Sequence, residues 1–229
     1  MSVTNKTVTP VGSEVFVSRY TGVQRVNHWL TAALFTLLGL SGLAMFSPYL
    51  FFLTGIFGGG QSTRAVHPWL GVLLMLSFAV LFVRFWRLNV PNGDDVKWLI
   101  KLPDILRNRH QGLPPLGKYN AGQKAVFWSQ SALIILMFTS GIVIWDQYFA
   151  TYTLVDQKRA ALLIHSLAAI LAISIILVHV YAGLWIRGTS RAMMRGSVTG
   201  GWAHRHHLKW FQQAARAGKV HTEADSHGD

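Results

Sequence analysis

Cysteine is absent from all 229 residues of the chain. Without thiols the chain forms no disulfide bond, ligates no iron–sulfur cluster or Cys-type zinc ion, and attaches no c-type haem covalently. Any redox centre in this protein must therefore be held by histidine or methionine, without a covalent tether.

Charge is also scarce. Charged residues make up 13% of the chain and hydrophobic residues 51%, whereas a soluble domain carries about 25% charged residues. The apolar residues are gathered into long uncharged runs, which indicates an integral membrane protein. The net charge of +12 does not point to nucleic acid, because the basic residues lie between the apolar runs and form no recognised motif.

Four apolar runs are long enough to cross a bilayer as helices, at about 1.5 Å of rise per residue. We predict an all-α integral membrane protein, a four-transmembrane-helix bundle in one membrane domain (1–210) followed by a polar tail (211–229). The predicted spans are, approximately, 26–47, 67–87, 124–145 and 160–186, with a polar connection at 88–123. Before them, Val15-Phe16-Val17 hints at a short structured piece on the membrane surface or against a partner.

Lysine and arginine are distributed unevenly about these spans. Four spans place both termini on one side, and 18 of the 21 basic residues lie there, in the N-terminal segment, the 84–124 connection and the tail. The other three, Arg64, Lys158 and Arg159, lie in the two remaining loops. The positive-inside rule therefore predicts that both termini are cytoplasmic and that the tail is a cytoplasmic tail.

Two histidines lie inside the fourth apolar run, AALLIHSLAAILAISIILVHVYAGLWI. His165 and His179 are fourteen positions apart, which at about 100° per residue is close to four turns. Both side chains therefore leave one helix face, about 21 Å apart along the axis. A histidine deep in a span is costly and favours a functional role.

Two further histidines match these in depth. His67 opens the second span on the outer side, where His165 lies, and His28 opens the first span on the cytoplasmic side, toward His179. Either one alone reads as an interfacial polar group, but the depth match predicts two pairs. A pair of imidazoles on opposite sides of a plane saturates a low-spin iron, so we predict two b-type haems that transfer electrons.

Other uses of these residues stay open. Gly71 and Gly183 each follow a histidine by one turn, which suits a close porphyrin but equally suits helix packing. A zinc site or proton pathway is the rival use of membrane histidines. It would normally recruit Asp or Glu, and the four spans contain neither, which weakens it.

Short strings along the chain resemble the gamma (cytochrome b) subunits of respiratory, membrane-bound formate dehydrogenases, four-helix proteins with two haems. They are RVNHW, VHPWLG, GKYNAGQK, SGIVIW, LLIH, HVYAGLWIRG and, in the tail, GWAHRHHLKW. The resemblance covers most of residues 15–210. It implies His67 and His165 as ligands of an outer haem, and His28 and His179 as ligands of an inner one.

The resemblance also implies partners in the bacterial inner membrane. Electrons from formate oxidation in a molybdenum- or tungsten-containing alpha subunit would arrive through an iron–sulfur beta subunit on the outer side. They would leave to a quinone, menaquinone or ubiquinone, near the cytoplasmic face. This chain is then the quinone-reducing subunit of an oxidoreductase complex, not its formate-oxidising subunit, and the family suggests a larger multimer.

The resemblance places the quinone beside the inner haem, against the loop before the third span, where this chain has Asn120 and Gln123. Amides can hydrogen-bond quinone carbonyls, although Asn120 equally suits a helix cap. Four other histidines are expected to face solvent or a partner, and the last three are a weak metal-site candidate: His110, His204, His206 and His207. The rival functions are a cytochrome b of hydrogenase or thiosulfate reductase type, and a haem-free anchor or histidine-lined transporter.

Overall fold

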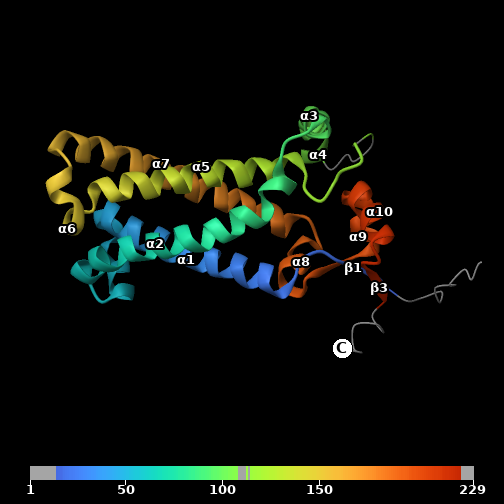
Figure 1. Cartoon of the computed structure of the whole chain (residues 1–229), viewed down its shortest axis with the longest axis horizontal. Coiled ribbons are helices and arrows are strands. Elements are labelled where there is room, and N and C mark those ends of the chain that lie inside the picture. The colour runs from blue at the N-terminus through green and yellow to red at the C-terminus, as the bar shows by residue number, and fades with distance from the viewer. Residues whose placement is uncertain (1–13, 108–111, 113, 223–229) are drawn as a thin grey trace, which may run out of the picture.

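Four long helices form the body of the protein, as the computed structural model shows for residues 14–107, 112 and 114–222 (Figure 1). They are α1 (Gly22–Phe46), α2 (Gly60–Phe85), α5 (Ala121–Ile144) and α7 (Val155–Trp185). Each is long and apolar enough to cross a membrane. The predicted four-helix membrane bundle is confirmed.

All four helices begin earlier than the apolar pattern indicated, α2 and α7 by the most. α2 starts at Gly60 and not at residue 67, and α7 starts at Val155 and not at residue 160. The first turns of both helices are polar, so an apolar window does not detect them. Pro68 consequently lies inside α2, where it cannot donate a helical hydrogen bond to the carbonyl four residues before it.

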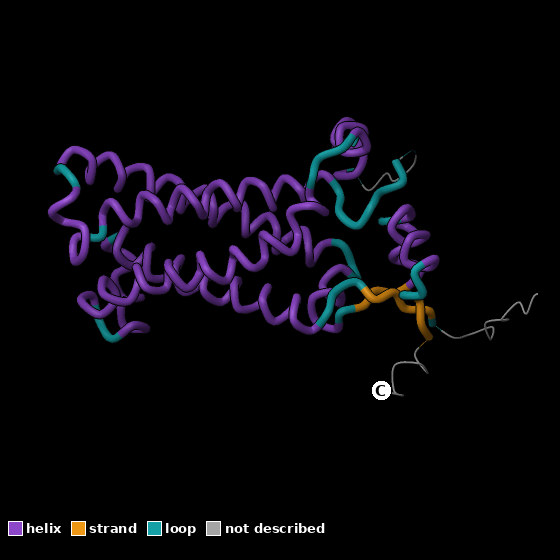
Figure 2. The backbone as a smooth tube through the Cα atoms, viewed as in Figure 1, coloured by secondary structure: helices purple, strands orange, loops and turns teal. Residues whose placement is uncertain are grey.

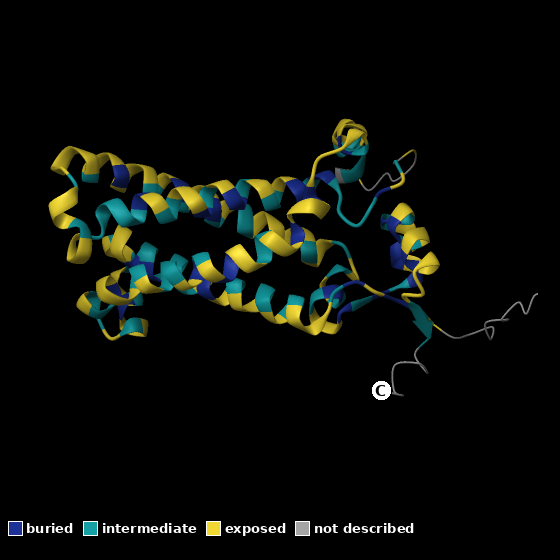
Figure 3. Ribbon diagram, in the orientation of Figure 1, coloured by how far each residue is buried: buried dark blue, intermediate teal, exposed yellow. Residues whose placement is uncertain are grey.

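The bundle consists of two helix pairs. α1 packs along α2 and α5 packs along α7, and smaller contacts between α2 and α5 and between α1 and α7 join the pairs (Figures 1 and 2). Only 17 to 22% of the most apolar stretch of each helix is buried in the protein. Large apolar residues lie on the outside instead, such as Val83 and Leu184, each 70% exposed. Exposed positions recur along all four long helices (Figure 3). Such a surface fits lipid and not water.

One end of the bundle, here called the loop end, carries only short connections. They are η1 (Pro48–Phe57), α6 (Asp146–Phe149) and η3 (Ala150–Tyr152). An aromatic cluster joins α2 to α6: the ring of Trp145 lies 5.2 Å from that of Trp69 and 5.0 Å from that of Tyr148. Aromatic rings of this kind favour the membrane–water interface.

The opposite end, here called the sheet end, carries everything else that is folded. The connection between α2 and α5 contains η2 (Trp86–Asn89), α3 (Gly93–Ile100) and α4 (Leu102–Leu106). Beyond α7 come α8 (Thr189–Arg195), α9 (Gly200–His206) and α10 (Leu208–Arg216). Three short strands complete this end: β1 (Val15–Ser18), β2 (Ser197–Thr199) and β3 (Val220–Thr222).

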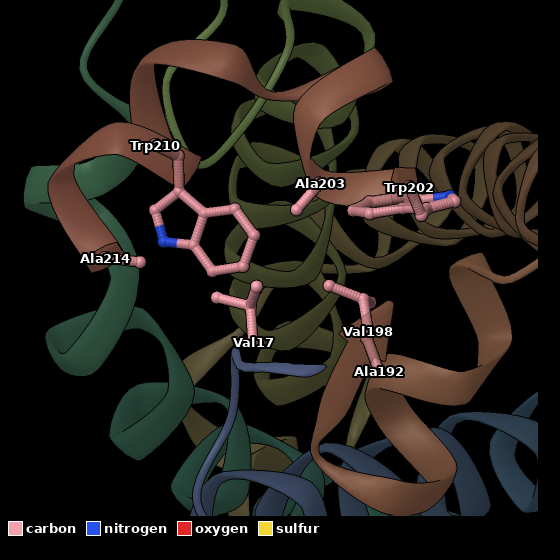
Figure 4. Packing of buried hydrophobic residues seen from close by; sticks show 7 residues of the cluster. All are labelled: Val17, Ala192, Val198, Trp202, Ala203, Trp210 and Ala214. Atoms are coloured by element: carbon pink, nitrogen blue, oxygen red, sulfur yellow. The ribbon is translucent and has the colours of Figure 1, made fainter. Parts of the chain in front are cut away.

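These three strands form one antiparallel sheet in the order β2-β1-β3. Phe16 of the central strand pairs with Thr199 on one side and with His221 on the other. We call this sheet together with α8, α9 and α10 the terminal cap. Its apolar core is shown in Figure 4: Val17, Ala192, Val198, Trp202, Ala203, Trp210 and Ala214. The short piece predicted at residues 15–17 is therefore a strand, and residues 211–222 of the predicted tail are folded, while 223–229 lie outside the described residues.

The terminal cap holds the loop before α5 through three consecutive carbonyls. The backbone N–H of Trp210 donates to Leu116 O (3.3 Å), and Nδ1 of His207 donates to Gly117 O (2.7 Å). Arg19 Nη2 donates to the carbonyl of Lys118. The chain ends thus position the loop that leads into α5.

His207 corrects one expectation from the sequence. It is 2% exposed, because its ring fills the space between the terminal cap and the loop, and it does not face solvent. Burial, reinforced by the positive charge of Arg19, lowers the pKa of His207 to about 3. His204 is exposed as expected, and His110 lies outside the described residues.

Candidate functional site

The four helix histidines meet in the two pairs expected from their depth. The ring centroids of His67 on α2 and His165 on α7 are 6.3 Å apart, with ring planes at 68°. Those of His28 on α1 and His179 on α7 are 6.4 Å apart, with ring planes at 50°. The first pair lies toward the loop end and the second toward the sheet end, and α7 contributes to both.

These separations fit one metal ion between the two rings of each pair. A metal–imidazole bond of about 2 Å, with about 1 Å more from nitrogen to centroid on each side, places trans imidazoles roughly 6 Å apart. Among the residues that the structure describes, no group of three or more His, Cys, Asp or Glu side chains could hold a metal ion. A zinc site needs three or four such ligands, so each pair suits an ion whose remaining positions a planar cofactor fills.

The same absence of a three-ligand group among the described residues applies to the tail histidines. His204, His206 and His207 do not form a metal-binding group within the described part of the chain. His207 instead points its Nδ1 at the Gly117 carbonyl. The weak metal-site hypothesis for this cluster is therefore wrong.

A cavity of about 1060 Å³ opens beside the His67–His165 pair. All four long helices line it, so it lies between the two helix pairs. Glycines line it on several helices: a Cβ added to Gly71 would meet open space, and one on Gly42 or Gly141 would lie 3.5 Å from the ring of His67 or His165. The volume fits a large ligand, and the open space at Gly71 leaves room for it to approach the helix backbone closely.

The basic residues of the loop end line this cavity. Arg64, Lys158 and Arg159, the three basic residues outside the main basic side, all line it. Lys158 is paired with Asp146, and Arg159 Nη1 lies 3.4 Å from Asp156 Oδ1. Sequence reasoning missed this role, although the signal was present: these three residues are the exceptions to the charge asymmetry.

Hydrogen bonds fix the orientation of the His67–His165 pair. His165 Nδ1 lies 2.9 Å from the carbonyl of Met137, which can only accept, so Nδ1 carries the proton. Ser41 Oγ donates to Leu38 O (3.1 Å) and therefore accepts from His67 Nδ1 at 2.7 Å. In both rings Nε2 keeps its lone pair, as a metal ligand requires.

The His28–His179 pair is held differently. His28 Nδ1 is buried and has no hydrogen-bond partner among the described residues. Its ring is held instead by packing, edge-on to Trp29 at 5.4 Å between centroids. A Cβ on Gly183, one turn after His179, would meet open space. The pair is therefore accessible to a ligand, with fewer polar constraints than its counterpart.

Asn120 and Gln123 form the N-terminal capping box of α5. Asn120 Oδ1 accepts from Gln123 N (2.9 Å), and Gln123 Oε1 accepts from Asn120 N (3.1 Å). The capping alternative weighed from the sequence is thus observed. The box uses only the amide oxygens, so the two NH₂ groups are not part of it.

The next residue, Lys124, makes a buried ion pair that the sequence did not reveal. Its Nζ lies 2.7 Å from Asp95 Oδ2 and donates to Val90 O at 3.1 Å. Nearby, Trp128 Nε1 donates to Asn89 O at 2.9 Å. These bonds fasten the start of α5 to the connection that follows α2.

Comparison with known proteins adds an independent line of evidence. The family model described as prokaryotic cytochrome b561 matches residues 19–196. The chain is 40% identical to the formate dehydrogenase cytochrome b556(fdo) subunit of Escherichia coli (strain K12), over 87% of this chain and 94% of that protein. It is 37% identical to the nitrate-inducible cytochrome b556(Fdn) subunit of the same strain (85% and 90%). It is 32% identical to the formate dehydrogenase cytochrome b556 subunit of Haemophilus influenzae (89% and 85%).

Proposed function

The chain belongs to the prokaryotic cytochrome b561 family, and from this premise we propose that it is the di-haem cytochrome b subunit of a formate dehydrogenase. It is a multi-pass protein of the bacterial inner membrane that carries b-type haem. We assign one haem to His67 and His165 and a second to His28 and His179. The observation that carries the assignment is the pair of centroid separations, 6.3 and 6.4 Å, at two depths of one bundle.

The outer haem site is supported by its surroundings as well as by its ligands. The cavity beside His67 and His165 supplies the room, and Gly71 leaves open space at the backbone of α2. Haem, when bound, takes up and releases one electron at its iron. The protein's own part would be to hold that iron through the Nε2 lone pairs of His67 and His165, whose rings are fixed by hydrogen bonds at Nδ1.

The cations of the cavity fit the two carboxylates that haem b carries. Arg64, Lys158 and Arg159 line the cavity beside the haem position. Charge-assisted bonds from these side chains would hold the propionates and fix which edge of the haem faces the loop end. This role also accounts for basic residues on the side that the positive-inside rule leaves poor in them.

The orientation of the proposed transfer path in the membrane follows from the charge distribution. With the basic sheet end in the cytoplasm, the loop end faces the outer side and is the expected contact of an iron–sulfur beta subunit, itself bound to a molybdenum- or tungsten-containing alpha subunit. His67 and His165 would hold the haem that accepts electrons at this end, and His28 and His179, about 21 Å further along α7, would hold the haem that passes them on. Moving each charge fully inward works against about 2.3 kcal/mol per 100 mV.

The electrons leave to a quinone at the sheet end. Asn120 and Gln123 stand at the first turn of α5 there, and their NH₂ groups are suitable donors to quinone carbonyls. Protons for the reduced quinone come from the cytoplasm. The capping box supports this role, because it fixes both side chains while using only their oxygens.

Single-ligand variants test the haem assignment. His67→Ala and His165→Ala should each remove the outer haem, and His28→Ala and His179→Ala the inner one, so that each purified variant contains one haem by the pyridine haemochrome assay. His204→Ala, an exposed tail histidine, is the matched control and should keep two. Two haems in purified His179→Ala would contradict the assignment. A visible spectrum of the reduced wild-type protein without an α-band would exclude haem altogether.

Activity measurements then separate the donor and acceptor ends. In the whole complex, His179→Ala should abolish quinone reduction while formate oxidation with an artificial dye continues. Co-purification of a molybdenum- or tungsten-containing subunit, found by metal analysis, is expected for formate dehydrogenase. A nickel-containing partner would point to a hydrogenase instead.

A further inference from the structure

The two histidine pairs differ in what their Nδ1 atoms meet. His67 and His165 each donate Nδ1–H to a fixed acceptor, Ser41 Oγ at 2.7 Å and Met137 O at 2.9 Å. His28 Nδ1 is buried with no acceptor among the described residues. No hydrogen bond involves a ring nitrogen of His179 in the part of the chain that the structure describes. The difference is systematic: both members of one pair are anchored and neither member of the other is.

An acceptor at Nδ1 changes the electronic character of the ring. When Nδ1–H donates to an oxygen, negative charge shifts onto the imidazole, and Nε2 becomes the stronger base and the stronger ligand. Such a ligand stabilises Fe(III) more than Fe(II), because the oxidised ion carries more positive charge. The reduction potential of the iron therefore falls.

Ser41 is built for this role. Its hydroxyl hydrogen is already committed to Leu38 O at 3.1 Å, so Oγ faces His67 only as an acceptor. The residue is fully buried, so water does not compete for the contact. Ser140 Oγ lies 3.1 Å from His165 Nδ1 and is a second acceptor beside the Met137 carbonyl.

We propose that Ser41 and the Met137 carbonyl, acting through Nδ1 of His67 and His165, hold the outer haem at a lower reduction potential than the inner haem. The inference rests on the proposed haem ligation. Electrons then move from outer to inner haem downhill in potential, which offsets part of the work of moving negative charge inward across the membrane. Ser41 is a positioning residue: it acts on the iron only through His67.

Redox titration of the purified protein tests the proposal. Ser41→Ala removes the acceptor of His67 and should favour reduction of the outer haem by about tenfold, which is about 59 mV for one electron. The inner haem should titrate as in the wild type. Ser140→Ala should shift the outer haem less, because Met137 O still accepts from His165. Ser174→Ala is the matched control, since Ser174 Oγ bonds only Ile170 O of its own helix, and it should shift neither haem.

Two further measurements make each outcome decisive. The one-haem protein made by His179→Ala gives the potential and electron paramagnetic resonance signal of the outer haem alone, so each component of the titration is assigned. If Ser41→Ala fails to retain that haem, Ser41→Cys, whose sulfur is a weaker acceptor, should give an intermediate shift. An unmoved outer potential with both haems present, or a wild-type outer haem of higher potential than the inner one, overturns the proposal while leaving the ligands assigned. If the proposed haem ligation itself is wrong, the wild-type protein will not contain two b haems.

Discussion

Breaking the Lys124–Asp95 ion pair should loosen the sheet end of the bundle at one defined point. The two charged atoms are 2.7 Å apart, and the side chains are 7% and 10% exposed. Removing one partner of such a buried pair leaves an uncompensated charge and costs about 3–5 kcal/mol. We therefore expect Asp95→Ala to lower the local free energy of opening by that amount.

The two single variants should differ in size. Asp95 Oδ2 also accepts from Asn92 N at 2.7 Å, as part of the capping box of α3. Asp95→Ala thus loses an additional cap worth about 1 kcal/mol, whereas Lys124→Met leaves that cap in place. The double variant buries no unpaired charge, so its loss should be smaller than the sum of the two single losses by about 3 kcal/mol.

Hydrogen exchange followed by mass spectrometry measures this on the whole protein. A loss of 3 kcal/mol corresponds to exchange about 150-fold faster in peptides from the start of α5 and from α3. Lys101→Met is the matched control, because Lys101 and Asp104 form an exposed pair at 3.6 Å whose loss should cost less than about 1 kcal/mol. Equal exchange in Asp95→Ala and Lys101→Met would refute the reasoning, and additive losses in the double variant would show that the pair is not coupled.

Three other variants test the terminal cap, the outer cavity and the quinone loop. Burial holds the pKa of His207 near 3, so between about pH 6.5 and pH 3 the unfolded chain binds one more proton and stability falls as pH falls, by about 1.4 kcal/mol per pH unit. His207→Asn keeps a donor for Gly117 O and should remove that slope from thermal melts, which an unchanged slope would contradict. Arg64→Gln removes a cation that would hold a propionate, so it should lower the outer haem's reduction potential and loosen haem binding, seen as faster haem transfer to apomyoglobin. Gln61→Ala, at the same cavity, should transfer haem at the wild-type rate. Asn120→Asp keeps the capping oxygen but removes the NH₂ donor, so it should raise KM for quinone while the thermal melt of the protein is unchanged. An unaltered KM would remove Asn120 from the quinone site.

The histidine pairs could be predicted because they depend on periodic quantities. Span depth and the helical face are both set by counting along the sequence, and counting places His165 and His179 on one side of α7 with partners at matching depths. The starts of α2 and α7 were missed for the converse reason. Gln61 and Arg64 read as loop because they are polar, but both lie in the first turns of α2 and line the cavity.

The sheet end could not be predicted because its contacts are distant in sequence. Strands of three or four residues have too little alternation to detect, and β1 pairs with segments near residues 197 and 220. His207 lies in a polar string, and its burial depends on a carbonyl 90 residues away. Lys124 and Asp95 are 29 residues apart, and nothing local to either residue indicates that they meet.

The central position of β1 has a consequence for how the protein is made. Residues 15–18 leave the ribosome before the first membrane helix, yet both strands that flank them, 197–199 and 220–222, are synthesised after the last one. The strand must stay unpaired while all four helices are inserted, and the carbonyls of Leu116 and Gly117 gain their donors from Trp210 and His207 only then. Completion of this face therefore follows synthesis of the last membrane helix, and a chain that ends before Val220 leaves one edge of β1 unpaired.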